Sequence, residues 1–151
     1  MTRLIAVVLF SGLLFGADAA AVKAEPNLEK RSEKALIYAG ELLTAMRGEL
    51  DRNDVEKIKE QLVEFREAVD ISVDALAATG KNARRNPKFF KKAELRLREL
   101  QRRLETFKRD MGFDDRPVLD DVLAHVAKKI DALVEATLRG SGCDSCFSYW
   151  R

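Results

Sequence analysis

The chain has 151 residues, 34% of them charged, and a formal net charge of +2. This length leaves room for one domain, and the small net charge does not by itself indicate a polyanionic partner. Glycine and proline are scarce, with eight and three residues, whereas Ala, Leu, Glu, Lys and Arg dominate. That composition is typical of long helices and excludes a β-sandwich or a disordered chain.

The N-terminal residues have the pattern of a secretory signal peptide. Arg3 precedes an apolar run over residues 4–15, and Ala17, Asp18 and Ala19 form an A-x-A cleavage site. We expect residues 1–19 to be removed, with cleavage as late as residue 24 as an alternative. An uncleaved anchor would need about 20 apolar residues, which this run does not reach. The mature protein is therefore expected to be periplasmic or secreted, with no transmembrane segment.

Apolar residues at helical spacing predict two helices in the first half of the mature chain. The first runs from Asn27 to Leu50, and the second follows Asn53, which we expect to cap it with Glu56 at the capping-box position. Gly80 stands where a left-handed C-terminal cap is expected.

Two further helices follow with the same kind of signal. Asn86 and Pro87 predict the start of the third helix, which ends before Gly112, and the fourth runs from near Pro117 to Gly140. The four helices have similar lengths and short connections, so each should pack antiparallel to its predecessor. We therefore predict an all-α, up-down-up-down four-helix bundle over residues 25–140. A three-helix fold or a dimer of helical hairpins is the alternative.

Positive charge is concentrated on the third predicted helix and the loop before it. Residues 81–109 contain 12 basic and three acidic residues, whereas the flanking segments are acidic. One explanation needs no ligand: each glutamate has an arginine four residues later, and the neighbouring second helix carries Glu56, Glu60, Glu67 and Asp74. The other explanation is an anion-binding surface. Its candidate residues are Arg84, Arg85, Lys88, Lys91, Arg98 and Arg102.

The last residues, 141–151, differ in kind and are expected to form a flexible tail. They contain a C-x-x-C motif, Cys143 and Cys146, followed by Phe147, Tyr149 and Trp150. In an oxidising compartment this motif favours a local disulfide, and thiol-redox activity is the alternative. A structural zinc site is not expected, because the chain offers only two cysteines and one histidine.

His125, the single histidine, lies at the rim of the fourth helix's apolar stripe. Met46 on the first helix would lie at a similar position along the bundle axis. Because a histidine and a methionine can together ligate a haem, a cofactor-carrying bundle is a second alternative. We expect no cofactor, no metal site and no catalytic residues, because no carboxylate interrupts an apolar stripe where burial would raise its pKa.

The stretch Ala83-Arg84-Arg85-Asn86-Pro87-Lys88-Phe89-Phe90-Lys91-Lys92-Ala93-Glu94, with Asp115-Arg116-Pro117 downstream, resembles small exported helical-bundle proteins of bacteria. That resemblance implies a helical fold and no particular activity. The L-T-x-x-Q repeats of stress-induced periplasmic helical chaperones are absent.

The sequence thus favours a non-enzymatic exported binding or scaffold protein that contacts an anionic partner through its basic third helix. The partner would be an anionic envelope component or another protein. Nucleic acid is not expected, since no aromatic residues interleave the basic stripes.

Overall fold

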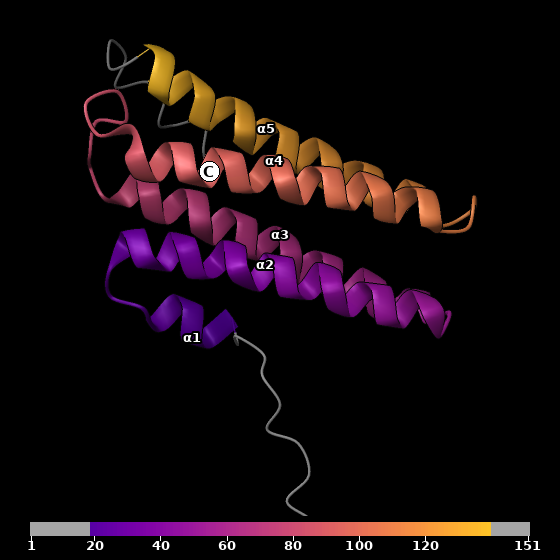
Figure 1. The fold of residues 1–151 in the computed structure, drawn as a ribbon. Helices are drawn as coiled ribbons and strands as arrows, with labels where there is room; N and C mark the ends of the chain where they lie inside the picture. Colours follow the sequence, from indigo (N-terminus) through magenta and orange to yellow (C-terminus); the bar gives the residue numbers. More distant parts are fainter. Residues whose placement is uncertain (1–18, 140–151) are drawn as a thin grey trace, which may run out of the picture.

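The computed structural model describes residues 19–139, and all regular secondary structure in this part of the chain is helical. Its elements are α1 (Ala19–Ala24), α2 (Leu28–Asp51), α3 (Val55–Ala78), α4 (Pro87–Asp110) and α5 (Pro117–Arg139) (Figure 1). The long helices α2 to α5 confirm the all-helical prediction, and their bounds lie within a few residues of those expected from the apolar spacing.

Local chemistry explains most of the helix ends. The Asn27 side chain accepts a hydrogen bond from the backbone N of Lys30 at 3.0 Å, which caps α2. Gly80 follows α3 with a φ of 64°, so the expected left-handed cap is confirmed. Pro87 opens α4 as predicted, although the Asn86 side chain makes no capping hydrogen bond.

The predicted cap of the second long helix was wrong by one residue. Asp54, not Asn53, caps α3, since its carboxylate accepts from the backbone N of Lys57 at 3.1 Å. Asn53 instead adopts a φ of 58° in the turn between α2 and α3. Asparagine tolerates this left-handed conformation better than most residues, so it suits the turn while the adjacent aspartate makes the capping bond.

The helices are arranged as two hairpins, α2 with α3 and α4 with α5, which lie against each other (Figure 1). The ion pair between Lys57 and Glu49 joins the start of α3 to the end of α2, so these helices are antiparallel. Lys92 pairs with Glu33 near the starts of α4 and α2, and Arg47 meets Asp110 near their ends. Helices α2 and α4 therefore run in the same direction.

Contacts between the hairpins differ from the expectation that each helix packs mainly on its predecessor. Helix α4 packs on α2 more extensively than on α3, and α5 packs on α3. Within the described chain, the backbones of α2 and α5 do not approach each other closely. The eight-residue connection between Ala78 and Pro87 is long enough to carry the chain across the end of the first hairpin, so α4 settles beside α2.

The core follows the predicted apolar stripes. It includes large side chains from all four long helices, among them Met46, Phe65, Leu97, Phe107 and Leu133. One buried polar contact crosses it, a 2.9 Å hydrogen bond between the hydroxyls of Ser32 and Ser72, which joins α2 to α3.

The short helix α1 was not anticipated as an element. It packs against α2 and α3, and Val22 buries all but 2% of its surface there. Lys23 forms an ion pair with Glu67 of α3. Residues 20–24 therefore make contacts of the same kind as the rest of the bundle.

Candidate functional site

The loop before α4 and the first turn of α4 present three basic side chains to solvent. The Asn82 side chain accepts hydrogen bonds from the backbone N atoms of Arg84 and Arg85, at 2.9 and 3.2 Å, and so fixes a tight turn. Ala83 is buried within this turn, whereas Arg84, Arg85 and Lys88 are all exposed. We call Arg84, Arg85 and Lys88 the junction cluster.

The junction cluster makes no direct ion pair within the described part of the chain. None of its three cations lies within 4.0 Å of a carboxylate in the part of the chain that the structure describes. The ammonium of Lys88 stacks over the Phe89 ring, 5.5 Å from its centroid. Such a cation–π contact leaves the positive charge available to an anion.

The other three predicted residues lie further along α4. Lys91 Nζ and Arg98 Nε lie 2.8 and 3.0 Å from the two carboxylate oxygens of Glu94, which is only 4% exposed. The hydrogen bond from Lys91, more than any other interaction, holds the pKa of Glu94 below its ordinary value against the opposing effect of burial. Arg102 is exposed and has no carboxylate within 4.0 Å among residues 19–138. The structure thus places Arg85 and Lys88 on one cavity, whereas Lys91 and Arg98 are paired with Glu94 and Arg102 lies further along α4.

A second row of basic residues on α4 faces α2. The Lys92 ammonium lies 2.7 Å from the Glu33 carboxylate, and Arg103 donates to the Gly40 carbonyl and the Thr44 hydroxyl at 3.1 and 3.0 Å. Arg96 pairs with Glu99 at 2.6 Å. These contacts account for part of the positive charge of α4 without a ligand.

Two expectations about charge pairing were therefore wrong. Of the three predicted i,i+4 pairs, the structure shows Glu94–Arg98, whereas Glu99 pairs with Arg96 and Arg103 reaches across to α2. Charge matching also takes place with α2 instead of the more acidic α3, because the connection before α4 places it beside α2.

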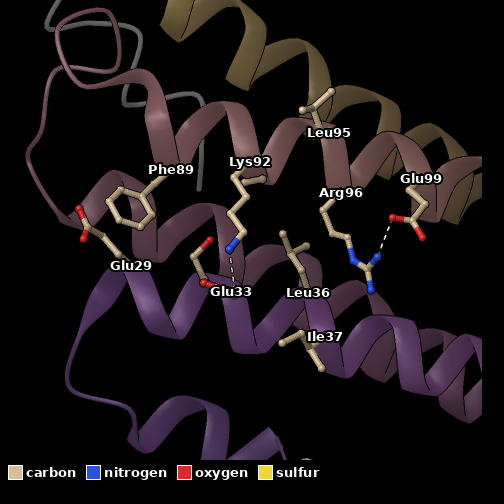
Figure 2. A pocket seen from close by; sticks show the side chains of 11 residues that line it. Glu29, Glu33, Leu36, Ile37, Phe89, Lys92, Leu95, Arg96 and Glu99 are labelled. Atoms are coloured by element: carbon tan, nitrogen blue, oxygen red, sulfur yellow. Dashed lines mark hydrogen bonds and ion pairs between the residues drawn. The ribbon is translucent and has the colours of Figure 1, made fainter.

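A groove runs between α2 and α4, next to the junction cluster (Figure 2). Its volume is about 370 Å³. The buried side chains of Leu36 and Ala93 form its floor, and Ile37 and Leu95 stand at its rims with 45% and 56% of their surfaces exposed. Figure 2 shows Lys92 reaching across the groove to Glu33, with Phe89 toward one end and Arg96 toward the other.

A second cavity of about 380 Å³ adjoins the groove at the junction cluster. It shares Glu29 and Phe89 with the groove and is also lined by Lys81, Arg85 and Lys88. The apolar residues of the groove were not predicted from the sequence. The available signal was that Ile37 and Leu95 fall outside the apolar stripes of their own helices.

His125 lies in a polar contact between α5 and α3. Its Nε2 is 2.8 Å from Asp70 Oδ1, which Lys129 Nζ also contacts at 2.7 Å. Met46 is buried in the core on α2, whereas the His125 imidazole lies against Asp70 at the α3–α5 interface.

Asp74 on α3 lies near this contact, and its pKa is shifted. Burial raises the pKa of Asp74, an effect that the positive charge of Lys129 partly offsets and the negative charge of Asp70 reinforces. Asp74 is exposed and lies outside the apolar stripe of α3, so it is not an acid that interrupts such a stripe.

The structure adds no geometry for the cysteine motif, and it shows neither a metal site nor a membrane-spanning helix among the described residues. Cys143 and Cys146 lie outside residues 19–139. Within those residues, no three His, Cys, Asp or Glu side chains gather as a metal site would require. No helix there is both long and apolar enough to cross a membrane.

Comparison with protein-family models, with curated proteins and with solved structures found no match to this chain. Its function is therefore inferred from the surface of α4 and the groove beside it.

Proposed function

We propose that this chain is a non-enzymatic exported binding protein that holds an anionic partner at the junction cluster. The observation that carries the proposal is that Arg84, Arg85 and Lys88 are exposed together with no carboxylate within 4.0 Å in the described chain. Elsewhere on α4, cations such as Lys91, Lys92 and Arg98 have acidic partners. An unneutralised cluster attracts anions more strongly than paired charges do.

We infer that α2 to α5 form an up-down-up-down four-helix bundle, released outside the cytoplasm after cleavage of the signal peptide. The contacts of α1 support cleavage after Ala19 over cleavage after Ala24, because the later cut would remove buried Val22 and the Lys23–Glu67 pair.

Retention on immobilised heparin at low ionic strength tests the binding function. The mature protein should bind and elute with salt, and the triple variant Arg84→Gln, Arg85→Gln, Lys88→Gln should elute at clearly lower salt. A matched control, Lys30→Gln, Arg66→Gln, Lys128→Gln, removes the same charge from α2, α3 and α5 and should elute close to the parent. Flow-through of the parent, or equal shifts for both variants, would show that the junction cluster is not the binding surface.

A further inference from the structure

The groove between α2 and α4 has an apolar half that the anion-binding proposal does not use. Ile37 on α2 and Leu95 on α4 expose large apolar surfaces on opposite sides of the groove (Figure 2), and the buried residues Leu36 and Ala93 line it between them. Single exposed apolar residues are common on proteins, but these two flank one cavity of about 370 Å³. That volume lies in the range of sites for small molecules.

The adjoining cavity supplies positive charge at one end of this groove. Of its three basic lining residues, Lys81 is paired with Glu29, the single acidic residue that lines it. Arg85 and Lys88 remain without a carboxylate within 4.0 Å in the described chain. The two cavities share Phe89 and Glu29, so the Phe89 ring connects the cationic end to the groove, which the Lys92–Glu33 pair spans.

The size of this site decides between a small ligand and a protein partner. The lining spans Glu29 to Ile37 on α2 and Lys88 to Glu99 on α4, which is about 12 and 17 Å along the helices. A stable protein interface buries about 800 Å² on each partner, far more than two exposed apolar side chains provide. A narrow apolar strip with a cationic end suits a ligand with one alkyl chain and one anionic group.

We infer that the groove binds a free single-chain anionic amphiphile, such as a fatty acid. Its anionic group lies at Arg85 and Lys88, and its chain passes Phe89 and lies between Ile37 and Leu95. The Lys92–Glu33 pair spans the groove, but both side chains are exposed, so displacing it costs little. This inference rests on the proposed function, since it names the partner of the junction cluster.

Calorimetric titration of the mature protein with a homologous series tests the inference. The probes are butanoate, octanoate, decanoate and dodecanoate, each below its micelle concentration. Affinity should rise about two- to fourfold for each methylene that enters the groove. Decyltrimethylammonium has the same chain as a control but a positive head, and it should bind at least tenfold more weakly than decanoate.

Two groups of variants separate the two halves of the site. Ile37→Asp and Leu95→Asp should each weaken dodecanoate binding at least tenfold, whereas Val63→Asp, the same kind of change at a residue 68% exposed on α3, should not. The pair Arg85→Gln, Lys88→Gln should weaken decanoate binding but leave decanol binding unchanged. Thermal unfolding confirms that each variant is folded, and the chain-length series on the parent stands independently of them.

The outcomes distinguish this inference from the proposed function. Heparin retention through the junction cluster without any dependence on chain length would overturn the amphiphile and leave the anion-binding function standing. Binding to anionic vesicles but not to monomeric amphiphiles would also overturn it. Loss of both heparin and amphiphile binding would refute the two proposals together.

Discussion

The imidazole of His125 on α5 lies 2.8 Å from the carboxylate of Asp70 on α3. The same carboxylate oxygen is 2.7 Å from the ammonium of Lys129, one turn further along α5. The side chains of His125 and Lys129 are largely covered, and both contact the Asp70 carboxylate. This contact is a polar link between the two hairpins on the α3–α5 side of the bundle.

Replacing that carboxylate should weaken the bundle. The variant Asp70→Asn removes the carboxylate charge that lies 2.8 Å from His125 and 2.7 Å from the covered Lys129 ammonium, and we expect the free energy of unfolding to fall by about 1–2 kcal/mol. Urea unfolding at neutral pH measures it. The control Asp131→Asn, at an exposed position of α5, should change stability by less than about 0.5 kcal/mol. Equal effects in the two variants would show that the contact adds nothing.

Glu94 should stabilise the protein only while it is ionised. Its folded-state pKa is lowered, first by the hydrogen bond from Lys91, so its contribution is present above the ordinary value of 4.5 and is lost as the pH falls through the folded-state pKa. We expect Glu94→Gln to destabilise by about 1–2 kcal/mol at pH 7, because the buried side chain loses two charged hydrogen bonds. Unfolding curves for the parent and Glu94→Gln should converge in acid. A constant difference down to low pH would contradict this assignment.

Asp74 should show the opposite dependence on pH. Burial raises its folded-state pKa, so folding favours the protonated form, and its contribution to stability decreases as the pH rises from the ordinary value of 3.8 through the folded-state pKa. Asp74→Asn should therefore stabilise the protein at pH 7, and the gain should shrink in acid. Thermal melts of both proteins across this pH range measure the difference. A gain that grows as the pH falls would show that burial does not control this group.

Two glycines offer a matched test of backbone conformation. Gly48 lies within α2, and no atom stands within 4 Å of the place that an added β-carbon would take, so Gly48→Ala should stabilise by about 0.5–1 kcal/mol through helix propensity. Gly80 has equal space but a φ of 64°, and Gly80→Ala should destabilise by about 1 kcal/mol. Chemical denaturation of the two variants shows directly whether the free energy of unfolding rises or falls in each. Two changes of the same sign would contradict the conformational argument.

The contacts of α1 lead to a prediction about processing. Cleavage after Ala19 retains Val22 and Lys23 in the mature protein, whereas cleavage after Ala24 removes them. Intact mass of the exported protein should correspond to a chain that starts at Ala20. Deleting residues 20–24 should then lower stability by about 1–3 kcal/mol, since Val22 is fully buried. A mature chain that starts at Glu25 would refute the prediction.

Helix positions could be predicted because their signals are local. Apolar spacing marks the inner face of each helix, and residues such as Asn27, Pro87 and Gly80 mark ends through chemistry that acts within a few residues. The prediction that Asn53 caps α3 was wrong although this signal is also local. Asparagine and aspartate both cap helices well, and the conformation of the turn decides which of Asn53 and Asp54 does so.

Relationships between helices were harder to predict. The spacing of Glu99 and Arg103 predicts a pair within α4, but packing on α2 gives Arg103 the Gly40 carbonyl and the Thr44 hydroxyl instead. The carboxylate partner of His125 and the rims of the groove likewise depend on which helices are neighbours. Sequence order indicates that α4 follows α3, but not that it lies beside α2.

The eight-residue connection between α3 and α4 is the single covalent link between the two hairpins in the described chain. All other attachment between them is noncovalent, through the α2–α4 and α3–α5 interfaces and a smaller contact of α3 with α4. A chain cut within this connection should therefore reassemble from two separately produced fragments. Shortening the connection should instead favour an exchanged dimer, in which the α4–α5 hairpin of each copy completes the bundle of the other.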